Sequence, residues 1–209
     1  FTSTQEGPLL TLLFSSAQTQ HAALARIETF YEAPAEKGGG KYLSWATIRA
    51  EGRQICRGYE AFNFPVEIVR RWIGEMRRAE VGEGREQASD ATGPWYEPFC
   101  NAEERYLLEY LASLGAVDLL TSEASQPDTK PAQPSAPPTY LISSLSSISS
   151  TSLPHERLHA LYHLSPTYRQ FVSSNWSQLS AKARRVIEHD LSLRGYDERV
   201  YLDEWQAYL

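Results

Sequence analysis

Five residues near position 155 constrain the fold of this chain more than any other segment. The run His155-Glu156-Arg157-Leu158-His159 places two histidines four residues apart. On an α-helix, positions i and i+4 lie on one face about 6 Å apart at Cβ, so both imidazoles can reach one ion. Zinc suits them because it takes neutral imidazole nitrogen at about 2.0 to 2.1 Å in tetrahedral geometry. The spacing therefore predicts a helix here, with His155 and His159 as zinc ligands.

Glu156 is the candidate catalytic residue of this HExxH pattern. It follows the first histidine directly, so its carboxylate can face a zinc-bound water and act on it as general base. Zinc lowers the pKa of such a water toward about 7, which makes hydroxide available at neutral pH. With only five histidines in the chain, a chance match to the pattern is expected at roughly the one-percent level. The pattern thus predicts hydrolytic chemistry.

A third metal ligand must come from outside this helical turn, because two histidines cannot complete a tetrahedral site. Glu204 follows Val200-Tyr201-Leu202 and precedes an apolar helix side, so its carboxylate stands where a helix faces the core. We therefore predict Glu204 as the third ligand. The side chains weighed against it are His163, Glu188, His189 and Asp203.

Two supporting roles are expected from residues near the metal ligands. Asp203 can accept the spare N–H of a ligand histidine and so fix that ring. A phenolic hydroxyl can donate to the oxyanion that forms on a substrate carbonyl. The sequence does not choose among the candidates, and we carry Tyr208 forward as the catalytic donor. The tyrosines considered are Tyr162, Tyr168, Tyr196 and Tyr208.

The run from Leu153 to Tyr162 resembles the active-site helix of zincin metallopeptidases. The later run Asp203-Glu204-Trp205-Gln206-Ala207-Tyr208 resembles the second helix of the gluzincin branch, which supplies a glutamate as third ligand. The lethal-factor-like and short minigluzincin forms are the most similar. The resemblance covers about the last 70 residues, from Tyr140 to Leu209. It implies a zincin-like C-terminal half in which the strand from Tyr140 to Ser143 holds an extended peptide by edge pairing.

Hydrophobic periodicity predicts an α+β protein that is mostly helical and has a small sheet. Apolar residues at spacings of three and four predict helices over 18–31, from a cap at Ser44 through Cys56, over 66–79 after Pro65, from a cap at Asn101, over 181–193 and over 200–209. The strand candidates are Leu9–Phe14, Val117–Leu120 and Tyr140–Ser143.

Prolines predict one irregular loop and one helix start. The segment 122–138 holds five prolines and predicts an irregular loop rather than a linker, because neither side alone looks like a complete core. We therefore expect one zincin-like domain over 1–209, with its metal-binding half at 139–209. Pro154 fits a helix if that helix begins nearby, with Ser152 as cap and Pro154 in the first turn.

Charge and composition narrow the class of partner. The formal net charge of −6 argues against nucleic acid as the main partner. No apolar run approaches the roughly 18 to 20 residues that a membrane-spanning helix requires, so no membrane partner is expected. Cys56 and Cys100 lack CxxC spacing, and we expect free thiols rather than a single bridge because cytoplasmic chains normally keep their cysteines reduced. The expected location is the cytoplasm, with secretion as the alternative. The oligomeric state stays open.

Three functions are compatible with these residues. The leading hypothesis is a zinc metallopeptidase or amide hydrolase. The second is a zincin-derived metalloenzyme of another reaction class, acting on a small molecule in specialised metabolism, because Arg157 beside the metal could hold an acidic ligand. The third is a non-catalytic interaction module that uses the helical N-terminal half as its binding surface.

Overall fold

A four-stranded mixed sheet stands at the centre of the protein. The structure is a computed structural model that describes residues 1–34, 37–82, 93–119, 136–194 and 196–208. The strands β1 (Thr2–Glu6), β2 (Leu9–Phe14), β3 (Ala61–Pro65) and β4 (Tyr140–Leu145) lie in the order β1-β2-β4-β3. β2 and β4 are parallel, whereas the other two pairs are antiparallel. The sheet thus combines strands from both sides of the proline-rich segment.

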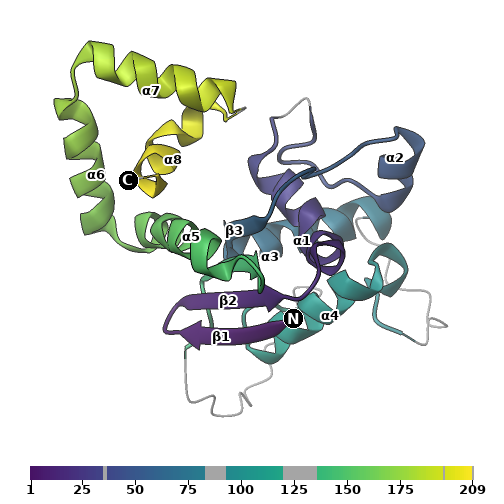
Figure 1. Cartoon of the computed structure of the whole chain (residues 1–209). Helices are drawn as coiled ribbons and strands as arrows, with labels where there is room; N and C mark the ends of the chain where they lie inside the picture. The colour runs from purple at the N-terminus through teal and green to yellow at the C-terminus, as the bar shows by residue number, and fades with distance from the viewer. Residues whose placement is uncertain (35–36, 83–92, 120–135, 195, 209) are drawn as a thin grey trace.

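Helices cover both faces of this sheet, which confirms the α+β class (Figure 1). The N-terminal helices are α1 (Ala17–Glu32), α2 (Trp45–Ala50), α3 (Val66–Glu80) and α4 (Ala102–Ser113). The C-terminal helices are α5 (Ser149–Leu164), α6 (Pro166–Gln178), α7 (Ala181–Leu193) and α8 (Tyr201–Ala207), with short 3₁₀ turns at Glu97–Phe99 and Glu198–Val200. In the part of the chain described, no helix is both long and apolar enough to cross a membrane.

Side-chain alternation along β4 explains the layers. Leu141 points into the large core made with α1, α3 and α4, whereas Tyr140 and Ile142 point to the opposite face and pack against Ala160 of α5. Successive residues of a strand face opposite sides, so a strand covered on both faces is buried along its length, and in β4 this includes Ser143 and Ser144. From α5 the chain continues outward through α6 and α7, and α8 returns to pack against α5 (Figure 1).

Two strand predictions are confirmed and one is wrong. β2 and β4 form where they were expected. Of the third candidate, Val117–Leu120, residues 117–119 are irregular and Leu120 lies outside the described residues. Gly115, at a φ of 66°, ends α4, and the N–H of Ala116 turns back to the carbonyl of Leu111. This closure is a Schellman turn, which directs Val117 into the core as part of a helix end. The described remainder of the proline-rich segment, 136–138, is irregular as expected, and the rest lies outside the described residues.

The predicted helices differ from the structure mainly in their ends. α1, α3, α4 and α7 form close to the expected bounds, and Asn101 caps α4 in a capping box with Glu104. The helix capped by Ser44 ends at Ala50 and does not reach Cys56. Gly52 and Cys56 both adopt positive φ there, which a helix does not allow.

The expected peptide-binding strand is not at an edge. β4 is hydrogen-bonded to β2 on one side and to β3 on the other, so it has no free edge for a peptide. β3, which the sequence did not reveal as a strand, is the outer strand on that side of the described sheet. It was missed because it is short and runs directly into α3, with Pro65 ending the strand.

A buried ion pair joins α1 to α4. The guanidinium of Arg26 donates to both carboxylate oxygens of Glu104, at 2.7 and 2.8 Å. It also donates to the carbonyls of Leu43 and Phe99, and the indole N–H of Trp45 donates to Glu104. Both charged side chains are at most 1% exposed. Because each charge is paired and hydrogen-bonded, the pair fixes how α1 lies against α4 and the loop before α2.

We predict that Arg26→Met lowers the free energy of unfolding by about 3–5 kcal/mol, because it leaves the Glu104 carboxylate buried without its charge partner. Urea denaturation measures the change. Arg105→Met is the matched control, since Arg105 makes an exposed pair with Glu97, and should change stability by less than about 1 kcal/mol. Similar losses in both variants would contradict the prediction.

Candidate metal centre

The helix that carries the HExxH residues begins earlier than the sequence indicated. α5 starts at Ser149, so Ser152 and Pro154 lie inside it and Ser152 is not its cap. The backbone N–H groups of Thr151 and Ser152 both donate to the carbonyl of Ile148, which closes the first turn before Pro154. Pro154 then removes only the donor to the carbonyl of residue 150. The helix continues through the histidines and is uninterrupted at the candidate site.

Arg157 does not face the candidate site. Its guanidinium pairs with Glu6 of β1 at 3.2 Å, and both side chains are exposed. It is also absent from the lining of the cleft that contains His155 and His159. Helical spacing explains this. Each residue turns the helix by about 100°, and residue 157 is two positions from both histidines, so it lies on the other side of the helix. The idea that Arg157 holds an acidic molecule beside the metal is therefore wrong.

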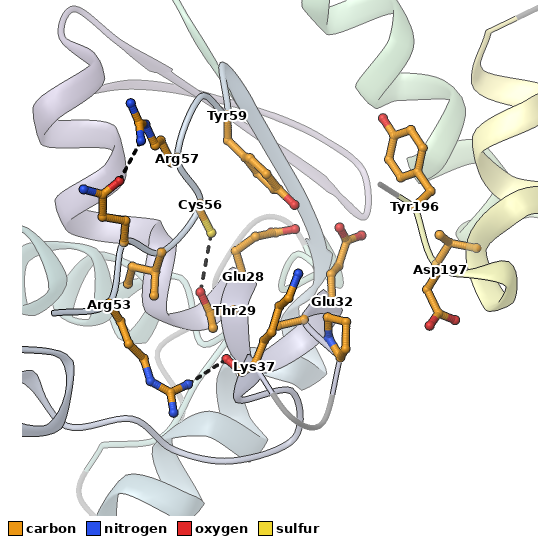
Figure 2. Close-up of a pocket in the computed structure, with 15 residues that line it drawn as sticks. Glu28, Thr29, Glu32, Lys37, Arg53, Cys56, Arg57, Tyr59, Tyr196 and Asp197 are labelled. Carbon is orange, nitrogen blue, oxygen red and sulfur yellow. Dashed lines mark hydrogen bonds between the residues drawn. The ribbon is translucent and has the colours of Figure 1, made fainter. Parts of the chain in front are cut away.

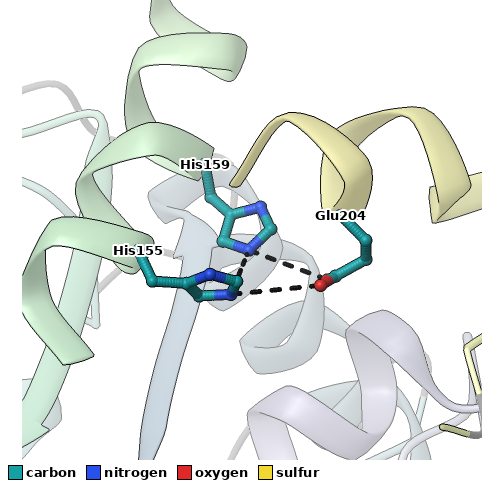
Figure 3. A group of neighbouring side chains, drawn as sticks. All are labelled: His155, His159 and Glu204. Carbon is teal, nitrogen blue, oxygen red and sulfur yellow. Dashed lines mark hydrogen bonds and ion pairs between the residues drawn. The ribbon is translucent and has the colours of Figure 1, made fainter. Parts of the chain in front are cut away.

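The structure brings His155, His159 and Glu204 together (Figure 3). The two Nε2 atoms lie 3.1 Å apart, and the Glu204 carboxylate lies 3.7 Å from Nε2 of His159 and 3.9 Å from Nε2 of His155. One ligating atom from each residue lies within 4.8 Å of the others. Three side chains with donor atoms that converge in this way can hold one metal ion.

A single short helix completes the surroundings of both rings. Nδ1 of His155 donates to the carbonyl of Ala207 at 2.9 Å, and Nδ1 of His159 donates to Asp203, also at 2.9 Å. Both acceptors belong to α8, the helix that carries Glu204. Because each Nδ1–H has an acceptor, both neutral rings have their lone pair on Nε2, which faces the other ring and Glu204.

Two linked hydrogen bonds, one within α8 and one from α6, hold Asp203 in place. The side chain of Gln206 donates to Asp203 at 2.9 Å, and the hydroxyl of Tyr168 on α6 donates to Gln206 at 3.0 Å. The sequence makes Tyr168 a candidate donor to the substrate, but in the structure its hydroxyl donates to Gln206. Asp203 thus stands where the sequence placed it, behind a histidine, and is itself positioned by Gln206 and Tyr168.

The converging atoms make a repulsive arrangement unless a cation lies among them. Burial is the largest influence on Glu204 and raises its pKa to about 7. Burial alone would lower the pKa of His159, but the hydrogen bond and charge of Asp203, with the charge of Glu204, raise it to about 9. Oε2 of Glu204 has no hydrogen-bond partner among the described residues. In the absence of a metal, a proton on His159 offsets this charge. A divalent ion would replace that proton.

The alternative ligands lie elsewhere. Glu188 and His189 belong to α7 and are outside the converging group and outside the cleft lining. His163 is one turn beyond His159, but its ring packs against Tyr140 at 4.9 Å between centroids. Of the carboxylates weighed, Glu204 is the one with an oxygen near both Nε2 atoms.

Two of the four candidate tyrosines line the cleft. The ring of Tyr208 lies 4.7 Å from that of His155, and its hydroxyl is 3.0 Å from that of Tyr196. The guanidinium of Arg194 stands over the ring of Tyr208. Tyr162 and Tyr168 are absent from the lining. Of the four tyrosines considered, Tyr196 and Tyr208 therefore lie in the cleft with the candidate metal ligands, and the catalytic role of Tyr208 stays a prediction.

Glu156 is held by a relay from two strands. The hydroxyl of Tyr140 on β4 donates to Oδ1 of Asn63 at 2.6 Å, and Nδ2 of Asn63 on β3 donates to Glu156 at 2.8 Å. The Tyr140 contact fixes which way the Asn63 amide points, so its N–H faces the carboxylate. Burial raises the pKa of Glu156 to about 7, opposed by His159 and by the Asn63 hydrogen bond. A carboxylate with this pKa can exchange a proton near neutral pH.

A cleft of about 760 Å³ contains the metal-ligand candidates and continues into a second cavity of about 470 Å³. Glu28, Glu32, Tyr59 and Tyr196 line both cavities. Figure 2 shows the second cavity, with Glu28 and Glu32 projecting from α1 and Tyr196 on the opposite wall. The cleft therefore runs from the histidines of α5 to the acidic side of α1.

Sequence reasoning missed four residues of this site. Asn63 and Tyr140 depend on strand pairing between distant segments, although the Phe-Asn-Phe alternation at 62–64 is a strand signal. Glu28 and Glu32 stand beside inward-facing apolar positions such as Leu24 and Ile27. A carboxylate among the inward-facing apolar positions of a helix is the sequence signal for these two residues, because charged residues are rarely buried without a role or a partner.

Comparisons with protein-family models, curated proteins and solved structures yield no match for this chain. The resemblance to zincins therefore stays an expectation from the motif, and the site must be judged on its own geometry.

The buried Glu28 carboxyl is expected to destabilise the fold as pH rises. Burial, and then the charge of Glu32, raise the pKa of Glu28 well above 4.5. A carboxyl whose folded pKa is raised supports stability below its unfolded pKa of about 4.3 and loses that support as pH rises toward the folded pKa. We therefore predict that Glu28→Gln raises the free energy of unfolding, more at pH 8 than at pH 5.

Urea unfolding at the two pH values measures this effect. The gain at pH 8 should be on the order of 1–3 kcal/mol, the amount that an unsatisfied buried polar group costs. Glu60→Gln changes an exposed carboxylate of the same cleft and should leave stability within about 0.5 kcal/mol. An equal gain at pH 5 and pH 8 would show that ionisation of Glu28 is not the cause.

Proposed function

We propose that this protein is a zinc-dependent hydrolase of peptide or amide bonds. His155, His159 and Glu204 are the metal ligands in this proposal, and Glu156 is the general base. The observation that carries it is the convergence of both Nε2 atoms on the Glu204 carboxylate, while α8 accepts both Nδ1–H groups. Rings oriented in this way present lone pairs to a common point.

The donor set fits zinc. Two imidazole nitrogens and one carboxylate are a known ligand set of catalytic zinc sites, where three protein ligands leave a position for water or substrate. The unpartnered Oε2 of Glu204 is the buried polar atom that such an ion would satisfy. Bound zinc would polarise a substrate carbonyl and lower the pKa of a water molecule.

The protein's own residues would position the substrate and move its protons. Glu156, with its raised pKa, takes a proton from the attacking water and returns it to the leaving amine. Asn63 keeps that carboxylate turned toward the cleft. Tyr208 and Tyr196 offer hydroxyls for the developing oxyanion. These roles give Glu156, Asn63 and the two tyrosines one task each in amide hydrolysis.

The position of β3 supports an extended peptide as substrate. β3 is the outer strand on its side of the described sheet, and residues 58–63 line the cleft beside Glu156. An extended peptide can add to such an edge through main-chain hydrogen bonds. The small-molecule alternative loses its motivation, because Arg157 points away from the cleft.

We predict that the purified protein binds one equivalent of zinc, and that His159→Ala and Glu204→Gln each abolish stoichiometric binding. Elemental analysis measures the content. Zinc at 100 times its dissociation constant should stabilise the fold by about 2.7 kcal/mol, and a chelator should reverse this. The controls are His163→Ala, from the same helix, and Glu188→Gln, from α7. Both should keep the zinc. A zinc-free wild-type protein that gains no stability from added zinc would refute the proposal.

We predict that Glu156→Gln keeps its zinc but loses hydrolytic activity by about 10²-fold or more, the usual contribution of a general base. Cleavage of a mixed peptide library, followed by mass spectrometry, measures the loss against wild type. Glu188→Gln should cleave at the wild-type rate. Zinc-loaded wild-type protein that cleaves no amide would instead favour another reaction class, and full partner binding by a His155→Ala, His159→Ala variant would favour the interaction module.

A further inference from the structure

Glu28 and Glu32 form an acidic pair that the hydrolytic mechanism does not use. They lie four residues apart on α1, so both project from one face of that helix. Figure 2 shows both carboxyls directed into the second cavity, opposite Tyr196. Glu28 is only 2% exposed, and its Oε2 has no hydrogen-bond partner in the described part of the chain. A buried carboxylate oxygen that opens on a cavity without a partner points to a missing cationic group.

Three basic side chains, Lys37, Arg53 and Arg57, line the same cavity. Figure 2 shows the Lys37 side chain directed toward the two carboxyls, but no ion pair joins it to either of them in the described residues. Arg53 is engaged with Glu51 and with the carbonyl of Lys37, and Arg57 donates to Gln54. Within the described residues, no ion pair reaches Glu28 or Glu32. The two carboxyls hydrogen-bond each other, so a proton shared between them reduces the negative charge in the wall of the cleft without supplying a cationic partner.

We propose that Glu28 and Glu32 bind a cationic group of the substrate, either a peptide's terminal ammonium or a lysine or arginine side chain. This inference rests on the proposed function, because it names the substrate class of the same cleft. Tyr59 and Tyr196 line both cavities, so one bound molecule can reach the pair and the metal ligands together. An ammonium or guanidinium carries several N–H donors, which match carboxylate oxygens without partners.

A second metal ion fits the pair less well. Within the described residues, the one group of three or more side chains that converges for a metal is His155, His159 and Glu204. Two carboxylates alone fall short of the three or more protein ligands of zinc sites and of the six or more oxygens of calcium sites. An organic cation needs only a few well-placed acceptors and a space of its own, which the cavity provides.

The test measures binding, using the full chain with Glu156→Gln so that bound peptides are not cleaved. The probes are trialanine amide and its N-acetyl form, with N-acetyl-Ala-Lys-Ala amide and its norleucine counterpart. Calorimetry or NMR titration gives each dissociation constant. At least one cationic probe should bind about tenfold more tightly than its neutral partner, which is about 1.4 kcal/mol. Preference for the free amino terminus identifies an N-terminal ammonium, and preference for lysine identifies a side chain.

Adding Glu28→Gln and Glu32→Gln should reduce this preference to within twofold. Glu188→Gln, on α7 and outside both cavity linings, should preserve it. Equal affinity for cationic and neutral probes, a preference that survives both substitutions, or no binding of either cationic probe would overturn the inference. Zinc content separates this failure from failure of the proposed function. A protein that binds one zinc but does not distinguish the probes retains the metal centre and loses only the cation site.

Discussion

The arrangement of the whole cleft depends on the buried pair between Arg26 and Glu104. Arg26 occupies the side of α1 that faces α4, where its five donors meet a carboxylate and two backbone carbonyls. Two and six residues later, the same helix directs Glu28 and Glu32 toward the cleft. Because this contact fixes α1, the helix cannot rotate to expose these carboxyls to solvent. The energy of the Arg26 pair thus keeps two acidic groups at a position that burial and mutual repulsion disfavour.

The other wall depends on a helix that could not form alone. α8 has seven residues, well below the length at which an isolated helix is stable in water. Packing holds it, through contact between Trp205 and Trp176 and the hydrogen bond from Tyr168 to Gln206. Within one turn this helix provides Glu204 and the acceptors for both histidines. Glu204 and the acceptors for both histidines therefore belong to one rigid element, which would favour a preorganised site.

What the sequence could reveal follows the range of each interaction. The helix of His155 and His159, the capping box of Asn101 and the carboxylate at Glu204 are local patterns, and the structure contains them all. Residues held by strand register could not be found this way. Asn63 meets Glu156 only because β3 pairs with β4, a contact between segments far apart in the chain. The start of α5 was misjudged because one missing donor at Pro154 costs less than the surrounding packing provides.

The electrostatics of the cleft link its two proposed cations. Glu28, Glu32, Glu156 and Glu204 all have raised pKa values, chiefly because burial disfavours their charge. The charge of Glu32 also raises the pKa of the other three carboxyls. A cation at the histidines or at the Glu28 pair would relieve part of that repulsion. The carboxyls that weaken the empty fold are thus the groups that would favour binding of a metal ion and a cationic substrate, as expected where a functional site is maintained at the expense of stability.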